Sequence, residues 1–349
     1  MILCEIDPHP LYYITTMRVM SAITLPVDLF GIYCIVAKSP PVMRTYSRLL
    51  LFYQVWATIT DSFTNLIFIP VAFFPFPISY HEGLLFSGLH MDMPYMHTVW
   101  LCLVVSTMGS VVQLFIFRWQ NLLVAGDPLK VNKRFIYVAC TAIFFLFNVA
   151  VTCAGLTIKN RVEELRPQYL QNYSCISSLD GIPGFNYFEM EELRRLFLVS
   201  TVEAFIVVVA SCLLIHLTFR SLRDTNISQK TIDMQRKFQK SLILQVTTPV
   251  VVVIIPGCSV MSLVCWADFR AGGSMVIHIQ EMTNLAILLI STHGFFGTLI
   301  MISVNHPYRM FVQEALKNCF KPCASRKLEP ASRPSEVSNP KLPSQPGPK

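Results

Sequence analysis

Polar side chains that exchange hydrogen bonds readily interrupt long apolar stretches at a few places in this sequence. Asp28, Asp61, Asn65 and His293 fall well inside such stretches. Carboxylate, amide and imidazole groups form hydrogen bonds with one another. Polar groups in apolar stretches usually face the interior of the protein. We therefore interpret these four residues as candidates for one central polar network, whose hydrogen bonds can differ between two packings of the protein. The alternative is a static set of satisfied polar residues that only sets how the segments pack.

A second group of residues has the chemistry to bind a small molecule. Glu203 and Glu281 lie near one end of two apolar stretches, where a carboxylate can pair with a cationic or hydroxylated ligand. Alternatively, Glu203 is a protonated or hydrogen-bonded structural residue and Glu281 is interfacial. Aromatic side chains near the same end are candidates for the mouth of such a pocket, although Trp and Tyr also form belts at membrane surfaces. These aromatics are Tyr95, Trp100, Phe185 and Trp266.

Motifs for catalysis or metal binding are weak or absent. The chain has no phosphate-binding loop, nucleophile elbow or HExxH sequence. His90, Asp92 and His97 have a loosely metal-like spacing, but no further Cys or His pair completes a zinc site. We therefore predict that the protein is not an enzyme and that it carries no metal and no cofactor.

The composition indicates which elements position these residues. Of the 349 residues, 53% are hydrophobic and 14% are charged, whereas soluble domains carry about 25% charged residues. A helix needs about 20 apolar residues to cross the ~30 Å hydrocarbon core of a bilayer, with every backbone polar group paired internally. Seven stretches meet this length, so we predict an all-α membrane protein with a seven-transmembrane helix bundle. They are residues 14–37, 49–74, 95–117, 135–158, 196–219, 242–265 and 276–304.

The basic residues indicate the orientation of this bundle. With seven spans, 21 of the 28 Lys and Arg residues fall on one side of the bilayer and 7 on the other. Because basic loops resist translocation, we predict that residues 1–13 lie outside the cell and that the C-terminus lies in the cytosol. Residues 1–13 contain no basic n-region and no small-residue cleavage site, so we expect the first span to be an uncleaved signal anchor. The net charge of +7 then reports topology and not nucleic-acid binding.

Two features of the predicted outer segments carry modification chemistry. Asn172 begins an Asn-Tyr-Ser glycosylation acceptor in the long loop between the fourth and fifth spans, so we expect a glycoprotein. Cys4 and Cys175 are the two cysteines that fall clearly outside, in oxidising surroundings that favour bridging. We predict a disulfide between Cys4 and Cys175 that ties the N-terminus to this loop.

The C-terminal residues change character twice. In residues 305–321, apolar side chains recur at helical spacing with Lys and Arg between them, which predicts a juxtamembrane amphipathic helix on the inner leaflet. Cys319 and Cys323 lie where palmitoylation would strengthen this attachment to the lipid bilayer; two unmodified thiols are the alternative. Residues 322–349 contain seven prolines and few apolar groups, so we predict a disordered cytoplasmic tail.

A series of different short motifs is distributed along nearly the whole chain outside this tail. They are Pro26, residues 31–35 and residues 38–40; Asp61 and Pro70; Ser228, Thr231 and residues 235–238; Gln245, Pro249 and Pro256; His293, Gly294 and Thr298; and residues 307–309. In order and spacing they resemble the serpentine receptor class H chemoreceptors of nematodes, within the Str group of seven-transmembrane G-protein-coupled receptors. Class I receptors of the same group are the nearest alternative, since residues 50–61 also fit them.

This resemblance implies a receptor for sensory perception, such as olfaction, that detects an environmental or animal-derived small molecule. It implies a heterotrimeric G protein as partner and a place in the plasma membrane, in the cilium of a sensory neuron. It also implies that Arg118, at the inner end of the third span, meets the G protein when the sixth helix moves. Pro249 and Pro256 would supply the kinks at which that helix bends; static kinks are the alternative.

The sequence departs from the rhodopsin-like pattern at two places. Met93 and Pro94 stand where a disulfide cysteine would be expected at the outer end of the third helix. Phe117 precedes Arg118, so the acidic partner that commonly restrains this arginine is missing. The restraint on Arg118 in the resting receptor must therefore differ.

Two other functions fit seven apolar helices. A ligand-gated channel subunit of inverted seven-helix topology would place the N-terminus inside, against the distribution of basic residues. A small-molecule transporter would be favoured by duplicated halves with broken helices, and the sequence contains no visible internal repeat. We therefore expect a receptor with its N-terminus outside.

Overall fold

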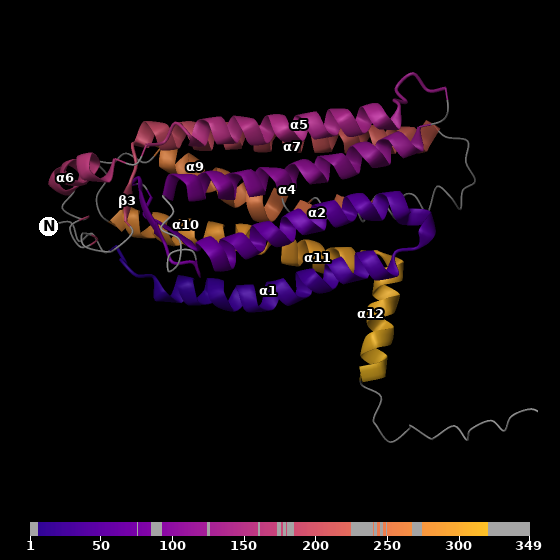
Figure 1. Cartoon of the computed structure of the whole chain (residues 1–349), viewed down its shortest axis with the longest axis horizontal. Coiled ribbons are helices and arrows are strands. Elements are labelled where there is room, and N and C mark those ends of the chain that lie inside the picture. Colours follow the sequence, from indigo (N-terminus) through magenta and orange to yellow (C-terminus); the bar gives the residue numbers. More distant parts are fainter. Residues whose placement is uncertain are drawn as a thin grey trace, which may run out of the picture.

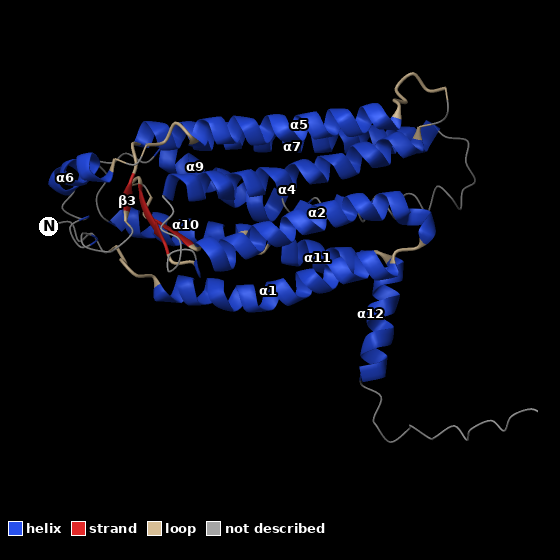
Figure 2. Ribbon diagram, in the orientation of Figure 1, coloured by secondary structure: helices blue, strands red, loops and turns tan. Residues whose placement is uncertain are grey.

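The computed structural model consists almost entirely of long helices that run side by side along one axis (Figure 1, Figure 2). It describes residues 6–74, 76–84, 93–123, 126–159, 161–172, 176, 179, 185–224, 240, 243–244, 247–248, 250–266 and 274–319. Within these ranges, five helical segments are long and apolar enough to cross a membrane. They are Leu11–Lys38, Met93–Leu122, Lys133–Gly155, Met190–Arg223 and Gln280–Val304.

The first two helices are separated by a proline-rich corner. α1 (Leu11–Lys38) ends where Ser39 precedes Pro40, because a residue before proline is biased away from helical backbone angles. Ser39 is accordingly extended, with a ψ of 128°. A short 3-10 turn, η1 (Pro41–Met43), leads into α2 (Arg44–Ser62), which packs against α1.

The second span ends earlier than its apolar run predicted. We expected a helix to residue 74, but α2 passes into a π-helical turn, η2 (Phe63–Phe68), and the helix stops there. Ile69 then has a left-handed φ of 38°, which is unusual for a β-branched residue. Pro70 follows and has no N–H to continue a helix. The prediction that Pro70 lies inside this helix is therefore wrong, since Pro70 begins a strand.

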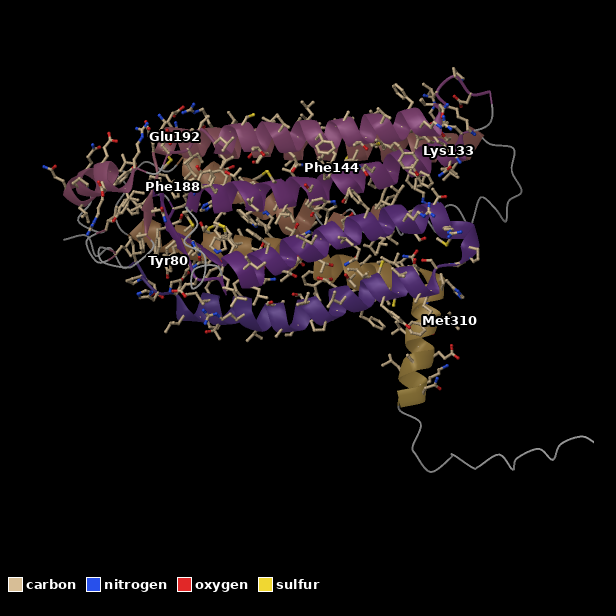
Figure 3. The ribbon with its side chains drawn as sticks, viewed as in Figure 1. Tyr80, Lys133, Phe144, Phe188, Glu192 and Met310 are labelled. Carbon is tan, nitrogen blue, oxygen red and sulfur yellow. The ribbon has the colours of Figure 1, made fainter. Side chains whose placement is uncertain are left out.

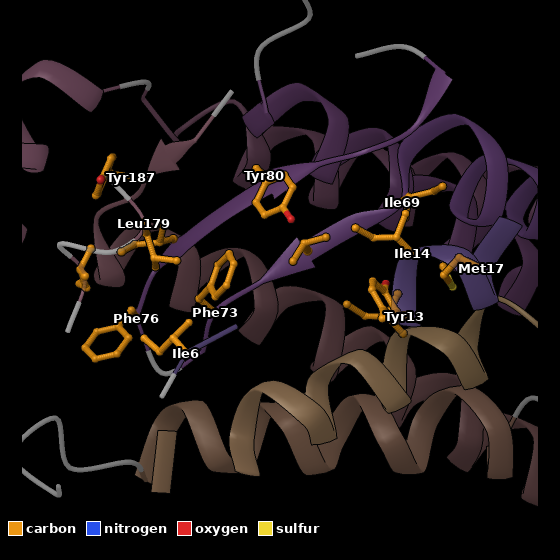
Figure 4. Packing of buried hydrophobic residues seen from close by; sticks show 14 of the residues in the cluster. Ile6, Tyr13, Ile14, Met17, Ile69, Phe73, Phe76, Tyr80, Leu179 and Tyr187 are labelled. Carbon is orange, nitrogen blue, oxygen red and sulfur yellow. The ribbon is translucent and has the colours of Figure 1, made fainter. Parts of the chain in front are cut away.

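A small antiparallel sheet closes the end of the bundle at which α1 begins. Its strands are β1 (Pro70–Ala72), β2 (Ile78–His81) and β3 (Asn186–Tyr187), in the order β1-β2-β3. Tyr80 and Phe73 of this region pack with Ile6 from the N-terminal segment in one hydrophobic cluster (Figure 4). Burial also lowers the pKa of His81, so its ring is neutral near pH 7. We call this end of the bundle the sheet end and the opposite end the α12 end.

The central helix of the bundle is α4 (Met93–Leu122), which contacts α2, α5 and α7. α5 (Lys133–Gly155) begins at a side-chain cap, because the Asn132 side chain accepts a hydrogen bond from the backbone N–H of Arg134 at 3.0 Å. α7 (Met190–Asp224) packs against both α4 and α5. These three helices form one half of the bundle (Figure 1).

The sixth helix is described in part. A π-helical turn, η4 (Val250–Ile254), precedes α9 (Ile255–Trp266). Pro256 lies just after this junction, and Pro249 lies outside the described residues. Because proline has no N–H, Pro256 cannot close the usual bond to the carbonyl four residues earlier, and such positions favour irregular helix. Pro256 therefore adjoins a widened turn.

The seventh span is interrupted, although its apolar run predicted one continuous helix. α10 (Ser274–Ile290) and α11 (His293–Val304) are separated by a turn at Ser291 and Thr292. The side chains of Ser291, Thr292 and His293 each bind the carbonyl three residues back, at 2.7, 2.9 and 2.8 Å. Such bonds compete with the backbone pattern of a helix, which explains the interruption. The span predicted over residues 276–304 is therefore one membrane-crossing segment, Gln280–Val304, that consists of two helices.

The last helix, α12 (His306–Cys319), leaves the end of α11 and runs across the bundle axis (Figure 1). The Tyr308 hydroxyl lies 2.7 Å from the Ser39 hydroxyl at the end of α1. The Lys38 ammonium lies 4.2 Å from the centre of the Phe311 ring, which is a cation–π contact. These two contacts attach α12 to α1.

Several predicted modification sites lie at or beyond the edge of the described residues. α6 (Val162–Asn172) lies at the sheet end, and its last residue is the predicted glycosylation site, whose side chain is not described. The predicted disulfide partners Cys4 and Cys175 lie outside the described residues, as does Cys323. Cys319 is the last residue of α12, and its side chain is not described. The glycan, the disulfide and the lipidation therefore stay predictions.

The close approach of α4 and α5 requires a glycine. A Cβ atom at Gly155 would overlap the side chain of Thr98, whose hydroxyl is held by the Pro94 carbonyl at 2.8 Å. A Cβ atom at Gly109, on the same interface, would meet Phe144 at an ordinary 3.5 Å. Only the first substitution should therefore separate the helices.

We predict that Gly155→Ala lowers the free energy of unfolding by about 1–3 kcal/mol, because the added methyl group overpacks the interface. The matched control, Gly109→Ala, should leave stability unchanged or raise it by up to about 1 kcal/mol, since alanine favours a helix interior. Thermal unfolding of the purified variants in detergent checks this prediction. Equal melting temperatures for the two variants would contradict it.

Candidate ligand cavity and polar network

A cavity of about 140 Å³ lies among α4, α5, α7, α9 and α10. Its wall is mainly apolar and includes Leu101, Val207, Val253 and Ile290. The strand segment that follows η2 lies along one side, where Pro70, Ala72 and Phe74 contribute to the lining. The Phe74 ring packs edge-on against Phe197 of α7, with ring centres 5.9 Å apart. Because the second helix stops before Pro70, the residues that follow it form part of the cavity wall at the sheet end.

Glu203 is the one acidic side chain among the described residues of this wall, which also include no Lys or Arg. The residue is 5% exposed, and neither carboxylate oxygen has a hydrogen-bond partner within the described part of the chain. Burying an unpaired carboxylate costs several kcal/mol. The structure therefore places Glu203 where the sequence suggested a ligand-binding carboxylate, with both oxygens open to a donor.

The aromatic candidates for the pocket separate into different environments. Trp100 lines the cavity, and its ring N–H donates to Thr64 Oγ1 at 2.9 Å. Tyr95 is 52% exposed and is not part of the lining. Phe185 packs against Tyr80 in the cluster beneath the sheet, with ring centres 5.2 Å apart. The side chain of Trp266 is not described.

Glu281 lies away from the cavity. It is exposed and lines a separate hollow between α10 and the start of α1, together with Asp7 and Tyr12. A carboxylate in this position is hydrated at the surface of the bundle. Glu281 and Glu203 were both predicted from the sequence as ligand-binding carboxylates, but they do not belong to one site.

His97 also lines the cavity, and one of its two ring nitrogens has a hydrogen-bond partner within its own helix. Its Nδ1 donates to the Met93 carbonyl at 3.2 Å, and its ring packs edge-on against Phe68 with centres 5.2 Å apart. The other two residues of the loosely metal-like group, His90 and Asp92, lie outside the described residues. His97 is thus held as a packing residue of the wall.

The centre of the polar network is the contact between Asp61 and His293. Both residues are 1% exposed, and Asp61 Oδ1 lies 2.8 Å from His293 Nδ1. The second oxygen of Asp61 accepts hydrogen bonds from the backbone N–H groups of Gly294 and Phe295, at 2.9 and 3.3 Å. These are among the first N–H groups of α11, which have no partner inside their own helix. Asp61 therefore caps α11 from another helix, at the positive end of its dipole.

Asp28 joins this centre through a threonine. The Thr298 hydroxyl donates to Asp28 Oδ1 at 2.6 Å and accepts a hydrogen bond from Gln54 Nε2 at 2.6 Å. Thr298 lies one turn beyond Gly294 in α11, and the Thr298 hydroxyl is also 2.9 Å from the Gly294 carbonyl oxygen. A Cβ atom at Gly31 would approach Thr298 Cγ2 to 2.5 Å. The absence of a side chain at Gly31 therefore allows α1 to pack close to Thr298 of α11.

Asn65 contacts the same interruption of the seventh helix at a different point. Its side-chain N–H donates to the Ser291 carbonyl at 2.8 Å. The preceding residue of η2, Thr64, accepts the hydrogen bond from Trp100 in the cavity wall. Ile290, another wall residue, offers its carbonyl to His293 Nδ1 at 2.8 Å. The cavity and the polar network are therefore joined by direct contacts.

Arg118 lies inside α4 and not at its end, because this helix continues to Leu122. Arg118 thus lies about one turn before the end of α4, near the α12 end of the bundle. Its guanidinium carbon lies 4.8 Å from the centre of the Tyr46 ring on α2, within the range of a cation–π interaction. An aromatic ring thus accompanies this arginine where the sequence lacks the usual acidic neighbour.

Several side chains of these sites were not predicted. Gln54 is buried two helical turns before Asp61, and this spacing on one helix face was a usable signal. Thr298 was noted only as part of the family resemblance. Tyr46 carries no local signal in the sequence, because its role depends on which neighbouring helix it faces.

Comparisons with known proteins identify the family and the fold. A family model described as "Serpentine type 7TM GPCR chemoreceptor Srh" matches residues 8–318. Serpentine receptor class H-72 of Caenorhabditis elegans is 19% identical over 307 residues, which cover 85% of this chain and 83% of that protein. The crystal structure of squid rhodopsin has a TM-score of 0.59 at 9% identity, over 91% of this chain and 89% of that chain. At this identity the last likeness concerns the fold alone.

A double-mutant cycle tests the contact at the centre of the network. We predict that Asp61→Ala and His293→Ala each lower the free energy of unfolding by about 1–3 kcal/mol, because each leaves a buried polar group without its partner. The double variant should lose less than the sum, by about 0.5–3 kcal/mol.

The control for this cycle combines His293→Ala with Arg194→Ala. Arg194 forms an exposed ion pair with Glu191 at 3.2 Å, so these two losses should add within about 0.5 kcal/mol. Unfolding of the purified variants in mixed micelles provides the free energies. Additive losses for Asp61 and His293 would show that the two side chains do not interact.

Proposed function

Because this chain belongs to the serpentine class H family of chemoreceptors, we propose that it binds a small molecule and activates a heterotrimeric G protein. It is a multi-pass membrane protein with a rhodopsin-like fold, and the class H resemblance predicted from its sequence is confirmed. The observation that carries the proposal is the apolar cavity with the unpaired Glu203 in its wall. We place the receptor in the ciliary plasma membrane of a sensory neuron, where it detects an environmental or animal-derived chemical.

The proposed orientation places the sheet end outside the cell and the α12 end in the cytosol. It is supported by the division of Lys and Arg, 21 to 7. Lys133, at the start of α5, lies at the α12 end, whereas Glu192 lies at the opposite end (Figure 3). Asn172 ends α6 at the sheet end, so its glycosylation would occur outside. In this orientation the cavity lies toward the outer face, where a ligand arrives.

A ligand in the cavity would act on the polar network through the seventh helix. α10 supplies Ile287 and Ile290 to the cavity wall, and the turn at Ser291 separates it from α11. A shift of α10 would change the hydrogen bond that His293 Nδ1 donates to the Ile290 carbonyl, and with it the contact between His293 and Asp61. A helix that already contains a turn can move one half against the other at lower cost than a continuous helix.

The proposed G-protein surface is the α12 end, where Arg118 rests over Tyr46. In the resting receptor the Tyr46 ring would restrain the guanidinium, in place of the missing acidic neighbour. Release of this contact would free Arg118 to meet the G protein, with α9 moving at the widened turn beside Pro256. The two ends of the receptor would thus be linked through α2, which carries both Tyr46 and Asp61.

Signalling without added ligand tests this restraint. We predict that Tyr46→Leu raises basal G-protein activation in cells, because it removes the ring but keeps an apolar side chain. Tyr46→Phe is the matched control and should signal as the wild type, since the ring is kept. Arg118→Ala should abolish signalling, alone or combined with Tyr46→Leu, at unchanged surface expression. Normal signalling by the Arg118→Ala receptor would remove this arginine from the mechanism.

A further inference from the structure

We propose that the cavity takes a compact apolar amine, with the ammonium group paired to the Glu203 carboxylate and the hydrocarbon part packed against the apolar wall. This inference rests on the proposed function, because it names the ligand class of the same site. It goes further in committing to a cation with a single small hydrocarbon group. The charge of Glu203, the engagement of three other polar groups and the size of the cavity carry it.

The charge requirement follows from the surroundings of Glu203. No basic side chain lines the cavity among the described residues, and both carboxylate oxygens lack a hydrogen-bond donor there. A buried carboxylate is stabilised most by a partner that brings an opposite charge together with hydrogen bonds. An ammonium group has three N–H donors, enough for both oxygens, whereas an alcohol has one donor and no charge.

Three of the other polar groups in the wall already have hydrogen-bond partners within the protein. The Ser200 hydroxyl donates to the Leu196 carbonyl at 3.1 Å, and the Trp100 ring N–H donates to Thr64 at 2.9 Å. His97 Nδ1 donates to Met93. A ligand with one polar end is therefore sufficient. A second charged or strongly polar group would be desolvated against apolar side chains without compensation.

The volume limits the apolar part of the ligand. The cavity measures about 140 Å³, and a cavity of about 150 Å³ lined by apolar side chains holds one benzene molecule. One six-membered ring, or a branched chain of similar size, is the expected hydrocarbon part. The aromatic residues Trp100, Phe147 and Phe197 in the wall also suit a cation, because ring faces attract positive charge.

Gly257 of α9 offers an independent way to close the cavity. It belongs to the lining, and a Cβ atom built on it would meet no atom within 4 Å. A larger side chain at this position can therefore extend into the empty volume without overlapping its neighbours. Gly257→Leu should fold and exclude every ligand of the cavity, whatever its charge.

Binding to the purified full-length receptor in lipid nanodiscs tests the proposal without a G protein. The probes share one ring: cyclohexylamine is cationic at neutral pH, cyclohexanol is a neutral donor, and cyclohexanecarboxylate is an anion. A ligand that binds the folded receptor raises its melting temperature, by an amount that increases with the ratio of ligand concentration to Kd. We expect cyclohexylamine to stabilise the wild type at concentrations at which cyclohexanol has a smaller effect and cyclohexanecarboxylate has none.

Three variants identify the site of this effect. Glu203→Gln should weaken the binding of cyclohexylamine by about 30-fold or more, the cost of removing one partner of a buried charge pair, while cyclohexanol binding stays within a few-fold. Glu281→Gln removes an exposed carboxylate at the same end of the bundle and should bind cyclohexylamine as the wild type does. Gly257→Leu should lose both cyclohexylamine and cyclohexanol.

The outcomes separate this proposal from the receptor function. It is overturned if cyclohexylamine fails to stabilise the wild type, if cyclohexanol binds as tightly, or if Glu203→Gln retains the amine. A cell assay in which neutral volatile compounds activate the receptor under the same conditions would then keep the proposed function and reject the ligand class. Amine binding that requires Glu203 without any G-protein response would keep the ligand class and reject the signalling role.

Discussion

The structure depends on one buried carboxylate, that of Asp61, which satisfies the start of a helix that is not its own. The seventh span is broken at Ser291 and Thr292, and a break inside a bilayer leaves backbone N–H groups that water cannot reach. Asp61 accepts two of these groups, from Gly294 and Phe295, and contacts His293 with its other oxygen. Without this cap the break would cost several kcal/mol. With it, the seventh span can exist as two halves that meet at a polar joint.

The contacts around this joint relate the outer cavity to the rest of the bundle. α10 forms part of the cavity wall, whereas α11 is tied to α1 and α2 through Thr298, Asp28 and Gln54. The second helix contributes on both sides: its π-helical turn binds the Ser291 carbonyl through Asn65, and the strand after it lines the cavity. A polar group in the membrane interior has few alternative partners, so each bond at the joint constrains its neighbours. This arrangement suits a protein in which occupancy of the cavity changes helix packing.

The long helices and the family could be predicted from the sequence, because the lengths of the apolar stretches and the order of the motifs can be seen in the chain itself. The grouping of Asp61 with His293 was also predicted, since few polar residues occur inside the apolar runs. The break at Ser291 was not predicted, because serine and threonine are compatible with a transmembrane helix and their side chains only compete with its backbone bonds here. The separation of Trp100 from Tyr95, and of Glu203 from Glu281, depends on helix rotation and on neighbouring elements. The cavity itself is lined by residues of five α-helices, of η4 and of a strand, and no single segment of the sequence encodes it.

The most direct test of the account is the orientation of the bundle in the membrane, because the ligand end and the G-protein end exchange roles if it is inverted. The measurement combines glycosidase sensitivity with detection of a C-terminal tag before and after permeabilisation, for the wild type, Asn172→Gln and Asn226→Gln. Asn226 begins the acceptor sequence Asn-Ile-Ser on the proposed cytosolic side and serves as the matched control. We expect a glycan that Asn172→Gln removes and Asn226→Gln leaves in place, with the tag detected only after permeabilisation. A tag detected on intact cells, with the glycan on Asn226, would contradict it and would favour an inverted ligand-gated channel.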